Sequence, residues 1–175
     1  MDGLTRGLVF AALALAALAT AGRVEAAPDC NASGELWSST TPAVNERHIF
    51  CGEIAGSKVK GYHSKVVLPS DVVTGVGTAT SLGNGIYNAT VTFSNSKTKL
   101  STFFPDACTA DQIVASAVYA AGHSTGSASP WGYYGPSAPS SSPGTTYCLN
   151  SASAAFQIRY ALDTDSDVNT AFPSP

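Results

Sequence analysis

Apolar and polar residues alternate in two segments of the chain, and each segment predicts a half-buried β-strand. Residues 85–93 place apolar side chains on one face and asparagine and threonine side chains on the other. Residues 156–162 repeat this period of two, again with the polar side chains facing outward. Shorter segments of similar character predict further strands at 47–51, 64–68 and 168–172.

One helix is predicted between the two clearest strands. Thr109 and Gln112 have the spacing of a capping box, an apolar stripe of helical period follows them, and Gly122 can end the helix. His123 then lies where an imidazole can complement the last helical carbonyls, and we interpret it as structural. Strands on both sides of a single helix predict an α+β fold with a mainly antiparallel sheet.

Residues 124–146 are rich in Ser, Gly, Pro and Thr and carry no charge, which predicts one long loop. The loop contains the aromatic residues Trp131, Tyr133 and Tyr134. Their rings can stack on a nucleic-acid base, or they can fasten the loop to the body of the protein. The sequence leaves both interpretations open.

Residues 1–26 have the pattern of a secretory signal peptide. A short start with one basic residue precedes an apolar run, and small residues at 24 and 26 suit a signal peptidase. The run is about fourteen residues long, whereas a membrane span needs roughly twenty, which makes a membrane anchor the weaker alternative. We therefore expect a secreted or periplasmic protein that begins at Ala27 and contacts no membrane after cleavage.

Four cysteines, Cys30, Cys51, Cys108 and Cys148, are widely spaced, and no C-x-x-C motif is present. This excludes a zinc ribbon and a thioredoxin-type redox centre. In an oxidising compartment two disulfides are expected, rather than free buried thiols. Three pairings are open to four cysteines; we favour Cys30 with Cys51 and Cys108 with Cys148, because the second bridge would join the ends of the long flexible segment.

Charge is low overall and unevenly distributed. The 175 residues include 12% charged residues, the net charge is −3 and the isoelectric point is about 5.4, which excludes binding of nucleic acid by bulk electrostatics. Residues 47–99 nevertheless hold six of the nine Lys and Arg residues. This cluster is either a solvated basic surface or a local anion-binding cleft. Near the C-terminus, Asp163, Asp165 and Asp167 alternate as in a calcium loop, but the glycine and glutamate of such a loop are missing, so we expect a hairpin turn.

His48 and His63 lie within the basic segment, on either side of a glycine-containing excursion. Cleavage of RNA without a metal needs a base for the 2′-hydroxyl, an acid for the leaving 5′-oxygen and a cation near the phosphorus. Two imidazoles and a lysine can supply these functions at neutral pH. Two structural histidines, or a metal site completed by Glu53, are the alternatives that spacing alone leaves open.

Four segments together resemble the EndoU family of endoribonucleases. H-I-F-C-G-E at 48–53 and K-G-Y-H-S at 60–64 resemble its double-histidine signature. K-L-S-T-F-F-P at 99–105, with the helix after it, resembles the bacterial branch, and T-A-F-P at 170–173 resembles the closing T-A-Y-P. The resemblance implies an EndoU-like nuclease domain over 46–175 with a ribonuclease A-like fold, preceded by an N-terminal extension over 27–45.

The resemblance also implies a role for each matching residue. His63 corresponds to the base, His48 to the acid, and Lys99 to the cation near the phosphate, with Lys97 as the alternative lysine. Glu53 would support a histidine. The remaining substrate-binding candidates are Ser101, Thr102, Thr170 and Phe172. Where the family commonly has tyrosine, Phe172 can stack on uracil but cannot donate a hydrogen bond.

The implied substrate is single-stranded, uridine-containing RNA, and the implied products carry 2′,3′-cyclic phosphate and 5′-hydroxyl ends. This chemistry requires no cofactor and the sequence offers no acidic cluster dedicated to Mn²⁺, although some family members are stimulated by that ion. We expect a monomer, and an inhibitor or immunity protein is a further candidate partner. The alternative hypothesis is a secreted module that keeps the fold and binds RNA or a protein without cleaving it.

Overall fold

A computed structural model describes residues 27–67, 71–141 and 144–175. The predicted signal peptide lies outside the described residues, as does Leu68, the end of one predicted strand. The described residues form one π-helical turn, one α-helix and a series of β-strands. In chain order these are η1 (Arg47–Cys51), β1 (Glu53–Ala55), β2 (Lys58–Lys60), β3 (Val73–Val76), β4 (Thr80–Gly83), β5 (Ile86–Phe93), β6 (Thr98–Phe103), α1 (Ala110–Gly122), β7 (Gly126–Ser127), β8 (Tyr133–Pro136), β9 (Gln157–Leu162) and β10 (Val168–Pro173).

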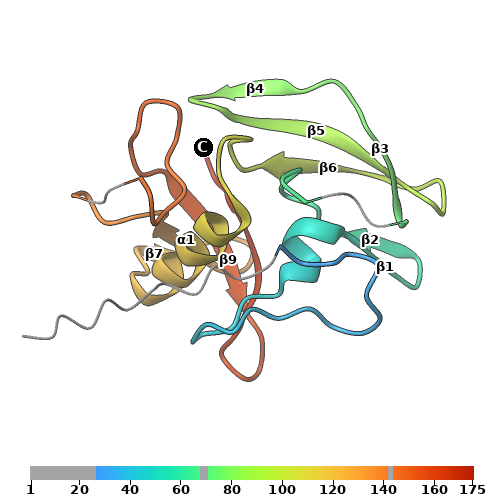
Figure 1. Cartoon of the computed structure of the whole chain (residues 1–175), viewed down its shortest axis with the longest axis horizontal. Coiled ribbons are helices and arrows are strands. Elements are labelled where there is room, and N and C mark those ends of the chain that lie inside the picture. Colours follow the sequence, from blue (N-terminus) through green and yellow to red (C-terminus); the bar gives the residue numbers. More distant parts are fainter. Residues whose placement is uncertain (1–26, 68–70, 142–143) are drawn as a thin grey trace, which may run out of the picture.

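Every pair of these strands is antiparallel. β1 pairs with β2 in a small hairpin, and β10, β9, β8 and β7 form a second sheet in that order. In the third sheet β5 is central: β6 pairs along one of its edges, and β3 and β4 share the other. This sheet lies on one side of the molecule, and α1 lies with β9 on the other (Figure 1). The architecture confirms the predicted α+β fold with mainly antiparallel sheets and one principal helix.

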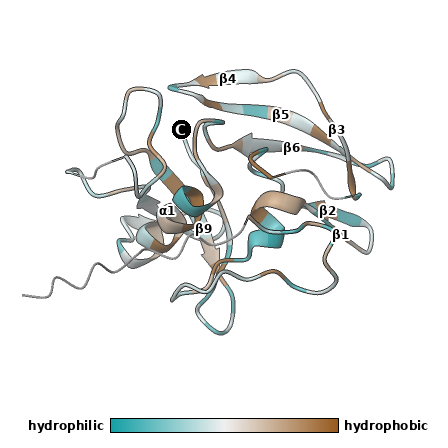
Figure 2. Ribbon diagram, in the orientation of Figure 1, coloured by the Kyte–Doolittle hydropathy of each residue, from teal (hydrophilic) through white to brown (hydrophobic). Residues whose placement is uncertain are grey.

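Two hydrophobic clusters hold these layers together. The larger one joins η1, α1, β9 and β10 and includes Phe50, Ile113 and Tyr160. The smaller one lies under β5 and β6 and includes Phe93 and Phe103. Hydrophobic residues accordingly recur in η1, β3 and β5 (Figure 2). Because β5 buries every second side chain, its burial follows the alternation that predicted the strand.

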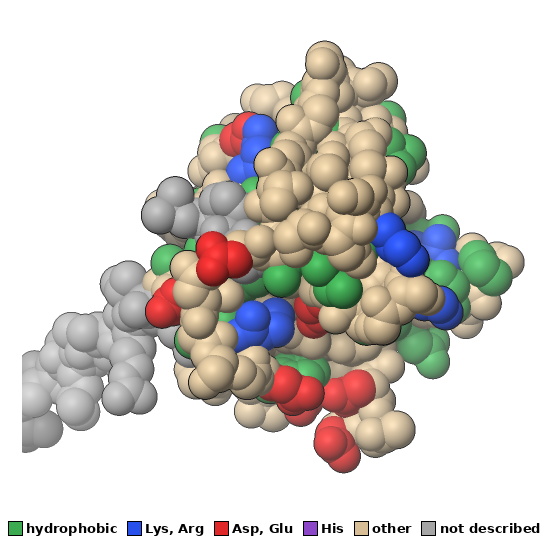
Figure 3. Space-filling model, turned by 90° about the vertical axis from the view of Figure 1, so that its right-hand side faces the viewer, with side chains coloured by type: hydrophobic (Ala, Val, Ile, Leu, Met, Phe, Trp, Pro, Cys, Tyr) green, Lys and Arg blue, Asp and Glu red, His purple; other side chains and the backbone are tan. Residues whose placement is uncertain are grey.

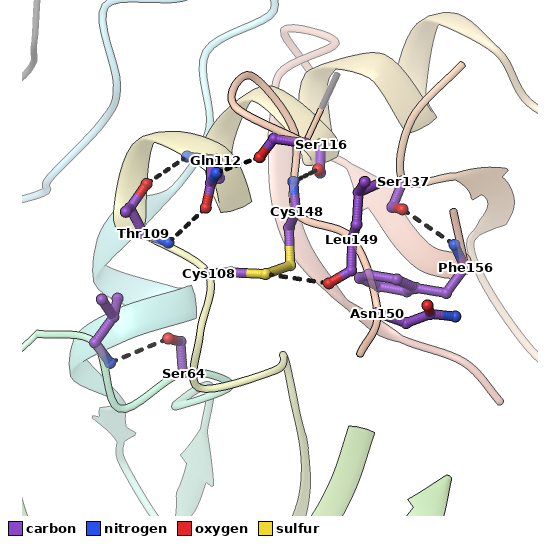
Figure 4. Close-up of a disulfide and its surroundings, with 12 residues drawn as sticks. Ser64, Cys108, Thr109, Gln112, Ser116, Ser137, Cys148, Leu149, Asn150 and Phe156 are labelled. Carbon is purple, nitrogen blue, oxygen red and sulfur yellow. Dashed lines mark hydrogen bonds between the residues drawn. A yellow bond between two sulfur atoms is a disulfide. The ribbon is translucent and has the colours of Figure 1, made fainter. Parts of the chain in front are cut away.

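The predicted helix cap and both predicted disulfides are confirmed. The Thr109 side chain accepts a hydrogen bond from the Gln112 backbone, and the Gln112 side chain accepts one from the Thr109 backbone. Cys108 beside this cap is bonded to Cys148, whose backbone N–H donates to Ser116 Oγ on α1 (Figure 4). The second bridge joins Cys30 to Cys51 at the end of η1.

The predicted strand at 47–51 is wrong, because this segment forms the π-helical turn η1. Its last four residues are all buried, whereas a strand at the edge of a core buries alternate side chains. Gly52, with φ of 74°, ends the turn and donates its N–H to the Arg47 carbonyl. That positive φ suits glycine and lets the chain leave in the direction of β1.

Two further expectations need correction. Residues 64–67 form no strand; the Val66 N–H instead donates to Ser64 Oγ, which bends the chain. The segment 124–146 is not one long loop, because it contains β7 and β8, and β8 pairs with β9. The 163–167 segment does form the predicted turn, in which Asp163 Oδ1 accepts hydrogen bonds from the Asp165 and Asp167 backbones.

No helix in the described ranges combines the length and the apolar character that crossing a membrane requires.

Candidate active site

A cavity of about 380 Å³ opens between the elements of the two clusters. Six of the residues singled out by sequence line it: His48, His63, Lys99, Thr102, Thr170 and Phe172. The other lining residues are Val59, Lys60, Gly61, Leu100 and Trp131. Segments that are far apart in the chain therefore bring both histidines and a lysine to one space.

η1 and the strand that follows it hold the His48 ring. The His48 backbone N–H donates to Asn45 Oδ1, and Nδ1 lies 3.2 Å from Glu53 Oε2 on β1. The hydrogen bond to His48 holds the pKa of the Glu53 carboxyl below its usual value, so the carboxylate is ionised and accepts the Nδ1 proton. This leaves Nε2 of His48 to exchange a proton with a substrate.

His63 is fixed between η1 and β6. Its backbone N–H donates to the Ile49 carbonyl over 2.6 Å, and its carbonyl accepts from Phe104 N–H over 2.9 Å. Ring atom Nδ1 lies 2.9 Å from the Thr102 carbonyl and 3.2 Å from Ser101 Oγ. A carbonyl only accepts hydrogen bonds, so Nδ1 carries the proton and Nε2 of the neutral ring carries the lone pair.

Burial lowers the pKa of His63 well below 6.5, and the positive charges of Lys99 and His48 lower it further. His63 is therefore neutral at neutral pH and is able to accept a proton. The two imidazoles thus differ in surroundings, one beside a carboxylate and one beside an ammonium. Their ring centroids are 6.0 Å apart.

Gly61 brings the two histidine segments together. The Tyr62 N–H donates to the His48 carbonyl over 2.8 Å, which draws the chain against η1. A Cβ atom at Gly61 would lie 2.1 Å from that same carbonyl oxygen, and the glycine has φ of 69°. Only a residue without a side chain fits this approach.

Lys99 points its ammonium group into the site from β6. Its Nζ donates to the Gly61 carbonyl over 2.8 Å and to Ser101 Oγ over 3.1 Å, and burial lowers its pKa to about 8. Ser101 is buried and donates its own proton to the Tyr62 carbonyl, so it supports the cavity from behind. Lys97 does not line the cavity; its Nζ donates to the Ser57 carbonyl in the β1–β2 turn.

Phe172 and Trp131 form an aromatic wall of the cavity. Phe172 stacks on the His63 ring with centroids 4.9 Å apart, and Trp131 meets Phe172 edge-on at 6.0 Å. Trp131 remains 46% exposed, so its ring is open to a ligand. The Arg159 guanidinium lies 4.0 Å over the Trp131 ring and donates to the Trp131 carbonyl. Tyr133, by contrast, packs against Tyr160 and fastens its strand to the sheet.

No pattern in the sequence indicated Leu100, which lines the cavity with 66% of its surface exposed. The sequence indicated Lys60 only as a member of the basic cluster at 47–99. It indicated Trp131 only as an aromatic residue of a predicted loop. A two-residue period in β6 would place Lys99 and Leu100 on opposite faces, yet both residues line the cavity.

Metal ligands are not assembled at this site. Within residues 27–67, 71–141 and 144–175, no group of three or more His, Cys, Asp or Glu side chains is arranged to hold a metal ion. The groups that can do chemistry are instead two imidazoles with fixed Nδ1 atoms and one ammonium. That set can take a proton, give a proton and stabilise an anion within one cavity.

Comparison with known proteins identifies one family. The model of a family described as bacterial EndoU nuclease matches residues 43–175. Neither a curated protein nor a solved structure matches the chain. The ribonuclease A-like character of the fold therefore stays a prediction.

Proposed function

Because the chain belongs to the bacterial EndoU nuclease family, its substrate is a nucleic acid, and we propose that it cleaves single-stranded RNA at uridylates. The observation that carries this proposal is the placement of His48, His63 and Lys99 around one cavity. The cavity combines proton-transfer groups with a stacking wall, and both are needed to hold and cleave a nucleotide.

The proposed reaction is an internal transfer of the phosphodiester. Nε2 of His63 removes the proton of the ribose 2′-hydroxyl, and the 2′-oxygen forms a bond to phosphorus. The bond from phosphorus to the 5′-oxygen breaks, and Nε2 of His48 donates a proton to that oxygen. The products are a 2′,3′-cyclic phosphate and a 5′-hydroxyl, so atoms and protons balance without water or a cofactor.

Other residues stabilise the reacting groups. Lys99 supplies positive charge near the phosphate while negative charge grows on its oxygens. Glu53 orients His48, and the Thr102 carbonyl and Ser101 orient His63. Phe172 and Trp131 stack on bases, and Thr170, at the cavity wall, can hydrogen-bond the base edge next to Phe172.

Localisation and metal use belong to the same proposal. Two disulfides and the predicted signal peptide support a secreted or periplasmic enzyme. The mechanism uses three protein groups and no metal, so we propose that cleavage proceeds without Mn²⁺ and that any Mn²⁺ effect is a stimulation. A non-catalytic binding module is the competing outcome of the experiment below.

The test uses purified protein and oligouridine, with and without Mn²⁺, followed by analysis of the 3′ ends. We expect cyclic phosphate ends from the parent and a loss of about 10²- to 10⁴-fold in His48→Ala and in His63→Ala. His123→Ala is the matched control, because His123 stacks on Tyr119 at the end of α1, outside the cavity. Cleavage by either cavity variant at the parental rate would refute the mechanism, and no product from the parent under any metal condition would favour the binding module.

A further inference from the structure

The two walls of the cavity differ in chemistry. Lys60 and Lys99 line the cavity from β2 and β6, whereas Phe172 and Trp131 line it from β10 and from the segment before β8. Proteins that hold single-stranded nucleic acid combine a basic groove for the backbone with aromatic rings for the bases. A single-stranded nucleic acid lying in this cavity would thus have its phosphates toward the lysines and its bases toward the aromatic rings.

The basic side continues beyond the cavity. Lys58 lies two residues before Lys60 on β2, so both side chains leave the same face of that strand. Lys97 lies two residues before Lys99, and its Nζ donates to the Ser57 carbonyl at the tip of the β1–β2 hairpin. We call Lys58 and Lys97 the outer lysines; with Lys60 and Lys99, which line the cavity, they form a basic band on β2, β6 and the residue before β6.

The spacing of this band matches an extended nucleic acid. Residues two apart on a strand are about 6.7 Å apart, which is on the order of the distance between successive phosphates in an extended single strand. On the face of the molecule that carries the hairpin, Lys and Arg side chains gather at the right-hand edge, and acidic side chains lie at the lower edge (Figure 3). A protein with net charge −3 therefore presents a local basic band.

The outer lysines are available for an anion. In the part of the chain that the structure describes, the only ion pair of a lysine with a carboxylate is that of Lys65 with Asp106. Glu53 lies opposite Lys60 in the hairpin register, and it is hydrogen-bonded to His48. Among the described residues no carboxylate forms an ion pair with Lys58 or Lys97, so their charges remain for an anion.

We propose that the outer lysines bind phosphates of the RNA beyond the one that is cleaved, so that the enzyme prefers oligonucleotides to dinucleotides. This inference rests on the proposed function, because it assigns the position of the RNA strand that the active site would cleave. In this arrangement the β1–β2 hairpin binds the phosphate backbone of the RNA, and the aromatic wall binds its bases.

The test compares KM for the dinucleotide UpU and for hexauridylate in the parent and in two variants. Lys58→Gln removes one charge, and Lys58→Gln/Lys97→Gln removes two. Lys65→Gln is the matched control, because it also removes an exposed lysine from the basic segment but leaves the band intact. We expect the double variant to raise KM about tenfold more for hexauridylate than for UpU, with kcat for hexauridylate close to the parental value.

Salt dependence gives a second measurement that does not need turnover. Binding of hexauridylate methylated on its 2′-oxygens, which cannot be cleaved, should weaken with salt, and the slope should decrease by about 0.7 for each phosphate contact removed. An unchanged slope and a KM shift equal to that of Lys65→Gln would overturn the inference. A parent that binds hexauridylate with the expected slope but cleaves nothing would instead refute the proposed function and leave the band established.

Discussion

The surroundings of His63 and Lys99 predict the pH dependence of cleavage. His63, the proposed base, has its pKa well below 6.5 because it is buried, and it must be neutral to accept a proton. Activity should therefore be retained as the pH falls through 6.5 and be lost only at lower pH. Lys99 has a pKa of about 8, so its charge and its stabilisation of the phosphate decline above that pH.

The measurement is kcat/KM for UpU between pH 4 and pH 10, which reports groups of the free enzyme. We expect an acid limb below 6.5 and an alkaline limb no higher than about 8, in line with the pKa values of His63 and Lys99. An acid limb at 6.5 or above would show that His63 is not the base in the surroundings described here.

At the scale of single residues, the sequence predicted those whose chemistry sits in a short motif. His48, His63 and Lys99 could be identified because titratable side chains in a recognisable order indicate the reaction. Leu100 could not be identified, and Lys60 was indicated only as a member of the basic cluster, because their part in the site comes from the position of the β1–β2 hairpin against β6 and not from a local pattern. For Trp131, the sequence did not distinguish stacking on a base from fastening the loop, because the residues that its ring contacts were not known.

At the scale of elements, periodicity was reliable where a segment was long and half-buried. β5, β9 and α1 combine a clear period with a cap or an exposed face. Short segments had no such pattern: β1 and β2 have three residues each, and the last four residues of η1 are all buried. A run of buried residues is compatible with a strand or with a helical turn. The positive φ of Gly52 ends this segment as a helical turn, and that backbone angle was not used in the prediction from sequence.

The contact between η1 and the second histidine segment predicts the effect of a substitution at Gly61. In Gly61→Ala, the added methyl group collides with the His48 carbonyl at a positive φ. We expect a loss of at least about 3 kcal/mol of unfolding free energy, measured by denaturant titration, and a fall in kcat of the folded enzyme. The fall in kcat follows because η1 and His48 must move to make room.

Gly56→Ala separates collision from backbone strain. Gly56 has φ of 58° in the β1–β2 turn, and nothing lies within 4 Å of a Cβ atom built there. Its substitution should cost only the strain of a left-handed residue, about 1 kcal/mol, with kcat close to the parental value. Equal losses in the two variants would mean that the contact at Gly61 does not position His48.

At the scale of the whole molecule, the site depends on how the two hydrophobic clusters are joined. η1 belongs to the larger cluster, Tyr62 belongs to the smaller one, and His63 follows directly after Tyr62. Both disulfides lie in the larger cluster, but only Cys30–Cys51 includes a residue of η1. The sequence left three cysteine pairings open, and the favoured one, chosen because the second bridge joins the ends of a long segment, is confirmed; the difference between the bridges in their distance from the candidate site required the structure.

The two bridges should therefore affect stability alike and activity differently. They close segments of 21 and 40 residues, so removing either should lower the unfolding free energy by about 3 to 4 kcal/mol. In Cys108→Ala/Cys148→Ala, kcat at a temperature where the protein stays folded should remain within about twofold of the parent, since that bridge supports α1, away from the reacting groups. In Cys30→Ala/Cys51→Ala, η1 loses its covalent anchor, and a small displacement of His48 should lower kcat by about tenfold or more. Equal kcat values in the two double variants, with both shown to be folded by circular dichroism, would mean that hydrogen bonds and packing alone hold η1 in its catalytic position.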